Sequence, residues 1–129
     1  MIQPQELRIG NIINIKSKYK RYNELFIEVE SINSTEINTY FRPYELNHCI
    51  GIPLTEEILL KCGFIKDEES DNGFFLKVNN DWSDIYIDVV YGYCEIVVNK
   101  HSLPIPLLYV HQLQNLIFSL TQKELTIQL

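Results

Sequence analysis

Residues 54–64, LTEEILLKCGF, decide how the chain is organised, because they carry the signals of a short helix. Thr55 is the natural N-cap, since its hydroxyl can accept a hydrogen bond from a backbone N–H that has no partner inside the helix. Glu56 and Glu57 then fall in the first turn, where the helix dipole favours negative charge. Gly63 can adopt the left-handed conformation that ends a helix. The sequence therefore predicts a short central helix between two groups of strands.

The residues before this helix are predicted to form a three-stranded antiparallel meander. Its strands are expected over residues 7–15, 25–32 and 36–42, which are rich in β-branched residues and are separated by polar turns. Pro43 ends this group of strands. The expected curl of such a meander favours a small SH3-like half-barrel over residues 1–43.

Residues 44–129 are predicted to contain the central helix, a second antiparallel meander and a long C-terminal helix. Residues 74–78 and a hairpin over 85–99 are expected to supply the three strands of this meander. Pro104 and Pro106 are expected to forbid regular structure between the meander and the last helix.

The last helix is predicted over residues 107–121, where apolar residues recur at helical spacing. The residues expected on its buried stripe are Val110, Leu113, Leu116, Ile117 and Leu120. Those expected on its wetter side are His111, Gln112, Gln114 and Asn115. The final residues, 124–129, are expected to add a strand. The whole chain, 1–129, is therefore predicted to be a single α+β domain.

The composition excludes several classes of protein. With 46% hydrophobic and 22% charged residues, the chain is too apolar for disorder. Its apolar runs are too short for a membrane helix, and its N-terminus, MIQPQELRIGN, lacks the pattern of a secretory signal. Three cysteines do not make a disulfide framework. We therefore expect a cytoplasmic protein that is neither secreted nor bound to a membrane.

The charge is unevenly distributed, and its basic part is a candidate nucleic-acid interface. The chain carries a net charge of −6, yet residues 1–25 hold five cations and only two anions. Most of these cations lie in the predicted loop KSKYKRYNE, residues 16–24, where cations could contact phosphates and tyrosines could stack on bases. The candidate contacts in this loop are Lys16, Lys18, Tyr19, Lys20, Arg21 and Tyr22.

A protein partner is the other candidate, because aromatic residues are enriched in protein interfaces. Tyr19, Tyr22, Trp82 and Tyr93 fall in predicted loops or turns and are therefore the aromatics expected to be exposed. The acidic stretch over residues 67–88 could meet a basic protein surface. We expect a monomer or a homodimer.

The sequence lacks the spacings that catalytic and metal sites require. The residues able to act as soft metal ligands are His48, Cys49, Cys62, Cys94, His101 and His111. They form no CxxC, HxxxH or HExxH pair, and the chain has neither a GxSxG elbow nor a GxxxxGK phosphate cradle. We therefore expect no catalytic residues, no metal and no cofactor, and a protein that is not an enzyme.

Three segments resemble a family of small uncharacterised proteins found in Bacteroidetes genomes, prophages and phages. They are ELRIGNIINI near the start, GIPLTEEILLKCGF in the middle and YVHQLQNLIFSLTQKEL at the end. The family often has glycine where this chain has Gln122. The resemblance implies an origin in a phage or mobile element, and it implies no mechanism. From the aromatic residues and the acidic balance described above, taken with this implied origin, we favour a non-enzymatic accessory or interaction protein that acts through protein contacts. The alternatives are a nucleic-acid-binding module that uses residues 16–22 and a minor virion component.

Overall fold

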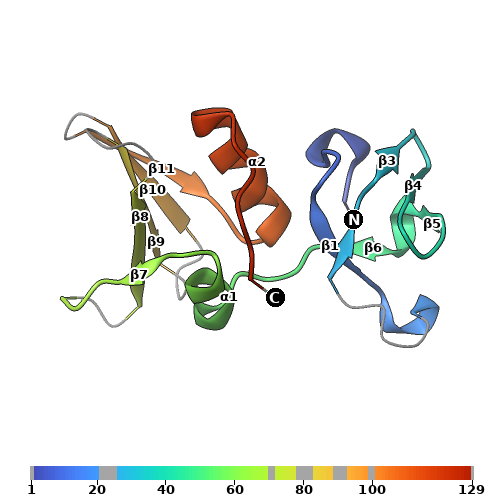
Figure 1. The fold of residues 1–129 in the computed structure, drawn as a ribbon, viewed down its shortest axis with the longest axis horizontal. Helices are drawn as coiled ribbons and strands as arrows, with labels where there is room; N and C mark the ends of the chain where they lie inside the picture. The colour runs from blue at the N-terminus through green and yellow to red at the C-terminus, as the bar shows by residue number, and fades with distance from the viewer. Residues whose placement is uncertain are drawn as a thin grey trace. The chain divides into compact units, whose positions relative to one another are not determined.

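The computed structural model describes residues 2–20, 26–69, 72–77, 83–88, 93–98 and 101–128, and it contains two compact units (Figure 1). The first unit comprises Met1–Pro53 and Tyr109–Asn115. The second comprises Leu54–Leu108 and Leu116–Leu129. The C-terminal helix α2, Val110–Thr121, therefore contributes its first half to one unit and its second half to the other.

The first unit is built from short strands in two three-stranded antiparallel sheets, with the orders β2-β1-β6 and β3-β4-β5. Its strands are β1 Ile12–Ile15, β2 Ile27–Glu28, β3 Ser31–Ile32, β4 Glu36–Asn38, β5 Tyr44–Glu45 and β6 Cys49–Ile50. A 3-10 turn, Pro4–Glu6, precedes β1, and two more, Ser17–Tyr19 and Leu46–His48, lie between strands. The sequence predicts three strands in one meander, whereas this unit has six short strands in two sheets, and β5 and β6 were not expected.

The predicted strand over residues 25–32 is divided between the two sheets. Ile27 pairs with Ile13 of β1, whereas Ile32 pairs with Ile37 of β4. Between them, the backbone N–H of Val29 donates to the carbonyl of Asn11 at 2.9 Å. Each sheet therefore uses only two residues of this segment as a strand, because the chain leaves one sheet and enters the other within it.

Alternation along these strands places the core of the first unit. In β1, Ile13 and Ile15 are buried while Ile12 and Asn14 are only partly so. The buried cluster comprises Ile2, Leu7, Ile13, Ile15, Ile27, Val29, Ile37, Tyr44, Leu46 and Cys49. Six of its ten members are β-branched, which suits a half-buried pleated surface.

The second unit contains one antiparallel sheet of five strands in the order β11-β10-β9-β8-β7. The strands are β7 Ile65–Lys66, β8 Gly73–Lys77, β9 Ser83–Asp88, β10 Tyr93–Val98 and β11 His101–Pro106. Every strand pairs with its neighbour in sequence, as a meander does. The predicted strands over 74–78 and 85–99 are confirmed as β8, β9 and β10, and the sheet gains β7 and β11.

Strand β11 corrects the expectation that two prolines forbid regular structure before the last helix. Pro104 pairs with Glu95 and Pro106 pairs with Tyr93. Because β11 is an edge strand and the two prolines are two residues apart, their missing N–H groups lie along one side of the strand. That side can face away from β10, so the pairing survives.

The short central helix is confirmed as α1, Glu56–Lys61. The hydroxyl of Thr55 accepts a hydrogen bond from the backbone N–H of Ile58 at 3.2 Å, which is the predicted cap. Gly63 has a φ of +89°, so it ends the helix in the left-handed conformation. Leu59 is fully buried. In the second unit, α1 and the second half of α2 lie on the same side of the sheet (Figure 1).

The long helix α2 is confirmed, but its two faces differ from the prediction. Val110, Leu113 and Ile117 are buried, whereas Leu120 is 37% exposed. His111 and Gln114, which were expected on the wetter side, are buried too.

The residues after α2 do not form the expected strand within the part that the structure describes, 122–128. Gln128 instead donates its backbone N–H to the carbonyl of Lys61, the last residue of α1, at 3.1 Å. This backbone bond attaches the C-terminal segment to the end of α1. With three antiparallel sheets and α2, the chain has the α+β fold that the sequence predicts.

Candidate functional site

The first half of α2 is attached to the first unit through the amide of Gln114. The side-chain oxygen Oε1 accepts a hydrogen bond from the backbone N–H of Ile12 at 2.7 Å. The Nε2 group donates to the carbonyl of Gly10 at 3.1 Å. Both ends of the amide are therefore satisfied, which explains why a polar residue of α2 can be 3% exposed.

Asn115 adds a second amide contact beside the first. Its Oδ1 accepts from Nδ2 of Asn11 at 2.8 Å, and its Nδ2 donates to the carbonyl of Glu6 at 2.8 Å. Gln114 and Asn115 together bind four groups between residues 6 and 12. These bonds attach the first half of α2 to residues 6–12 of the same unit.

His111 lies one turn before these amides and is fully buried, at 0% exposure. Among the residues that the structure describes, neither of its ring nitrogens, Nδ1 or Nε2, has a hydrogen-bond partner. Burial lowers the pKa of His111 below its usual 6.5, and the negative charge of Glu6 opposes this shift. The imidazole is therefore neutral at pH 7, with one nitrogen as a donor and the other as an acceptor.

A pocket of about 350 Å³ lies against this histidine. Ile2, Ile50 and Pro53 give it apolar walls, and Glu6, Cys49 and His111 also line it. Among the residues described around it, Glu6 is the one that carries a formal charge, and it is negative. The pocket therefore disfavours anions.

Tyr109 and Gly51 complete the lining of this pocket. The rings of Tyr109 and His111 are nearly parallel, at 9°, with their centres 5.7 Å apart. A Cβ atom on Gly51 would lie 2.6 Å from Cγ of Tyr109, so the tyrosine ring can occupy its place only because residue 51 is glycine. The backbone pairing of Pro53 with Tyr109 holds the two segments together.

The groups in and near the pocket are not arranged for nucleophilic catalysis. The Cys49 thiol donates a weak hydrogen bond to the carbonyl of Glu45 at 3.4 Å. Burial raises the pKa of Cys49 to about 11, so the thiol stays protonated at neutral pH. Cys62, in the second unit, is buried and has its pKa raised to about 11 in the same way. Within the described residues, no three His, Cys, Asp or Glu side chains come close enough to hold a metal ion.

The basic loop predicted to bind nucleic acid is only partly described. Lys16 and Lys18 are exposed and Lys20 is half-buried, while Arg21 and Tyr22 lie outside the described residues. Ser17–Tyr19 forms a 3-10 turn rather than an open loop.

Tyr19 is less available for base stacking than the sequence indicates. Its ring stacks on that of His48, with the centres 3.5 Å apart and the planes at 9°. The Nζ atom of Lys18 lies 5.4 Å from the ring centre. Arg42 also binds the carbonyl of Tyr19 through Nη2 at 2.7 Å. Tyr19 therefore packs within its own unit, with one ring face covered by the histidine.

The other two predicted contacts, Trp82 and Tyr93, come from the segment Leu54–Leu108 of the second unit. Trp82 lies outside the described residues. Tyr93 is the first residue of β10, paired with Asp88 and Pro106, rather than part of a turn as expected. It belongs to the second unit, whereas residues 16–20 belong to the first.

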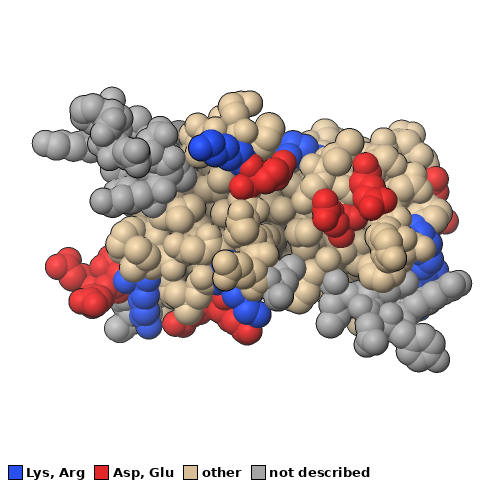
Figure 2. Space-filling model, in the orientation of Figure 1, with Lys and Arg blue, Asp and Glu red and all other residues tan. Residues whose placement is uncertain are grey.

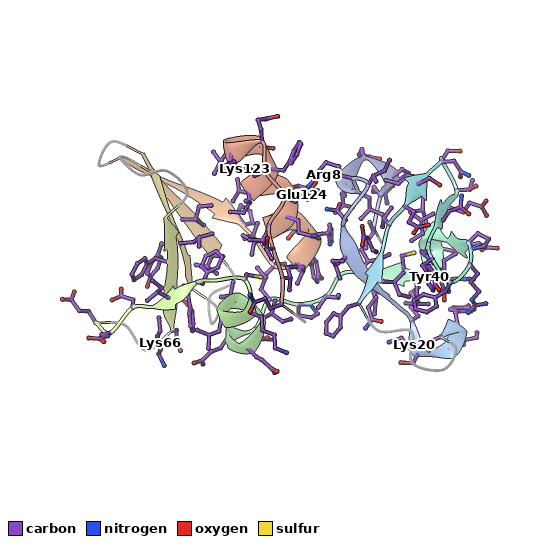
Figure 3. All side chains as sticks on the ribbon, viewed as in Figure 1. Arg8, Lys20, Tyr40, Lys66, Lys123 and Glu124 are labelled. Atoms are coloured by element: carbon purple, nitrogen blue, oxygen red, sulfur yellow. The ribbon has the colours of Figure 1, made fainter. Side chains whose placement is uncertain are left out.

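An exposed aromatic pair that the sequence reasoning missed lies in the turn between β4 and β5. Tyr40, which is labelled in Figure 3, is 86% exposed. Phe41 is 50% exposed, and the two rings meet edge to face at 82° with the centres 5.6 Å apart. The Thr39 hydroxyl accepts from the backbone N–H groups of Phe41 and Arg42, at 3.1 and 3.2 Å. It also donates to the carbonyl of Arg42 at 2.8 Å. The prediction of a strand over 36–42 concealed this turn, because a strand would bury alternate aromatics.

Comparisons with protein-family models, curated proteins and solved structures found no match to this chain. Among the helices that the structure describes, none is both long and apolar enough to cross a lipid bilayer.

Proposed function

We propose that this chain is a non-enzymatic accessory protein of a phage or mobile element that acts by contacting a partner protein. The observation that carries the proposal is the exposed aromatic pair Tyr40–Phe41. Large aromatic side chains contribute a disproportionate share of binding energy in protein interfaces. Two of them, side by side on a turn and largely open to water, have no evident role in the core of their own unit.

The turn that presents these rings is held by its own hydrogen bonds. Thr39 binds the next two backbone N–H groups and one carbonyl, so the backbone of the turn needs little ordering when a partner docks. Less ordering means a smaller entropy penalty on binding. The pair is therefore suited to act as an anchor that enters a pocket of the partner.

The charge of the chain favours a basic partner surface. The net charge is −6. On the face drawn in Figure 2, acidic side chains lie in several separate groups, and basic side chains lie beside some of them. A net negative chain attracts basic protein surfaces and repels phosphate backbones.

Nucleic-acid binding through residues 16–22 is the alternative proposal. Exposed Lys16 and Lys18 favour phosphate contacts, and those contacts would be independent of sequence. The stacking of Tyr19 on His48 weighs against base stacking by that residue. If this alternative holds, K18Q combined with K20Q lowers affinity for single-stranded DNA and flattens its dependence on salt.

Site-specific photo-crosslinking in the bacterium that carries the gene tests the main proposal. A photo-crosslinking phenylalanine analogue is placed at Phe41, and a matched analogue replaces the exposed Glu28 as the control. We expect one discrete protein adduct from position 41 that is absent from position 28 and is reduced by Tyr40→Ala. The same adducts from both positions, or no protein adduct at all, would contradict the proposal.

A further inference from the structure

We propose that His111 makes the attachment of the first half of α2 acid-sensitive, so that a proton on its ring releases residues 109–115 from the first unit while the strands of that unit stay paired. This inference goes beyond the proposed protein contact and rests on different residues. Its starting point is an imidazole at 0% exposure. Both ring nitrogens are closed to water and, among the described residues, have no hydrogen-bond partner. The ring must therefore leave its site before it can hold a second proton in water.

The surroundings of this ring favour its neutral form. Titratable side chains lie beside it from three segments: Glu6 of the first 3-10 turn, Cys49 of β6, and Tyr109, whose ring is nearly parallel to that of His111. Burial lowers the pKa of His111, and the negative charge of Glu6 opposes this shift. Cys49 stays uncharged, because burial raises the pKa of its thiol to about 11. The attraction of Glu6 is therefore weaker than the cost of burying an imidazolium.

The contacts that hold this half of α2 can break without unfolding the strands. The buried cluster of the first unit lies within residues 2–49 and contains no residue of α2. The helix is attached through the side-chain amides of Gln114 and Asn115. The backbone N–H of Val110 adds one more bond, to the carbonyl of Ile52 at 2.9 Å. None of these bonds belongs to the pairing of β1 with β2 or β6.

Proton linkage gives the direction and the size of the effect. The released ring binds a proton with the usual pKa of 6.5, whereas the buried ring binds one only at lower pH. The neutral ring therefore stabilises the attached form fully above that value, and this contribution is lost as the pH falls below it. Between about pH 7.5 and about pH 5.5, the equilibrium constant for release should rise several-fold, up to about tenfold. Most carboxylates stay ionised over this range, so histidines dominate the change.

Amide hydrogen exchange of the full chain, measured by NMR at about pH 7.5 and about pH 5.5, tests this inference. Each rate is divided by that of an unstructured peptide at the same pH, which gives an equilibrium constant for opening. The reporters are the N–H groups of Ile12 and Val110, which lose their partners on release. The controls are the N–H groups of Val29 and Leu46, which bind carbonyls within the first unit and outside α2. We expect the reporters to open at least about tenfold more often than the controls, and to show the acid rise.

Matched variants assign the acid response to one ring. His111→Phe keeps a flat ring and loses no hydrogen bond to the described residues, so it should fold and should remove the rise at the reporters. His48→Phe is the control, since it replaces the other histidine of this unit and keeps a ring to stack on Tyr19. It should leave the rise unchanged.

The ring signals of His111 in the parent give a second measurement that needs no variant. The midpoint of their titration should lie below the usual 6.5. A midpoint at or above that value would overturn the proposal. Equal opening of reporters and controls at both pH values, no acid rise at the reporters, or a rise that persists in His111→Phe would overturn it too.

Discussion

The side chain of Gln114 accepts a hydrogen bond from the backbone N–H of Ile12 at 2.7 Å, across 102 residues of sequence. Its other end donates to the carbonyl of Gly10 at 3.1 Å. A helix near the C-terminus therefore completes the hydrogen bonding of the loop that leads into β1. The first unit needs both ends of the chain, and this single amide is one of the connections that make it so.

Removing this amide should destabilise the first unit. Gln114→Ala leaves a part-buried N–H and a part-buried carbonyl without these partners. A fully buried group of this kind costs about 1–3 kcal/mol, so we expect a loss near the lower end of that range for each. Ser119→Ala, at an exposed position of the same helix, is the control and should change stability little. Chemical denaturation measures both. Equal stability of the Gln114 variant and the parent would show that water replaces the amide.

Replacing Gln122 by glycine should stabilise the chain. Gln122 has a φ of +59°, in the left-handed region that ends helix α2 and that suits glycine. Relief of this conformation is worth up to about 1 kcal/mol, partly offset by the greater freedom of glycine in the unfolded chain. Lys123→Gly is the matched control, because residue 123 has no positive φ and gains no such relief. A thermal melt in which both variants are equally destabilised would contradict this account.

The cap of α1 gives a third prediction. Thr55→Ala removes the acceptor of the Ile58 N–H and should cost about 1 kcal/mol. Thr55→Ser keeps the hydroxyl and should stay close to the parent. The denaturant midpoints of the parent and the two variants test this prediction. If Thr55→Ser is destabilised as much as Thr55→Ala, the loss comes from packing of the threonine methyl group and not from the cap.

Features of this fold that depend on contacts between residues close in sequence could be predicted, and those that depend on contacts between distant residues could not. The Thr55 cap, the left-handed Gly63 and the hairpin of β9 and β10 depend on residues within a few positions of each other, and local pattern indicates all three. The burial of Gln114 depends on partners at Gly10 and Ile12, which no local pattern reveals. Periodicity alone treats glutamine as a solvent-exposed residue, so it places Gln114 on the wrong side of a helix whose apolar stripe it otherwise predicts.

The candidate pocket was hidden for the same reason. His111, Glu6 and Gly51 come from three distant parts of the sequence, and each has an ordinary local context.

The prolines of β11 could not be interpreted from the sequence for another reason. Proline is tolerated in an edge strand but not in a central one, and the sequence does not say which strand lies at the edge of the sheet.

Acid should destabilise the folded chain through His111. Burial lowers the pKa of this residue in the folded state, so the unfolded chain binds the proton more readily, near the usual value of 6.5. Stability contributed by the neutral imidazole is present above that value and is lost as the pH falls, by at most about 1.4 kcal/mol per pH unit. Chemical unfolding of the parent and of His111→Phe at about pH 7.5 and about pH 5.5 should show a smaller acid loss in the variant. Identical losses would mean that other groups set the acid response.

The stripe of α2 gives the last prediction, and it also tests the oligomeric state. Leu113 is fully buried, whereas Leu116 is only partly buried and Leu120 is 37% exposed, so the packed centre of the helix lies nearer its start than the sequence predicts. Leu113→Ala should therefore cost about 2–5 kcal/mol, and Leu120→Ala well under half of that.

A dimer through the exposed end of the helix would reverse part of this order. In that case Leu120→Ala would lower the melting temperature in a manner that depends on protein concentration, because association stabilises only the folded state. Thermal melts of both variants at several concentrations, compared with sedimentation of the parent, distinguish the two arrangements. If burial within the chain is what stabilises α2, Leu113→Ala melts earlier at every concentration and the parent sediments as a monomer. A parent that sediments as a dimer, with Leu120→Ala as the more damaging change, would contradict it.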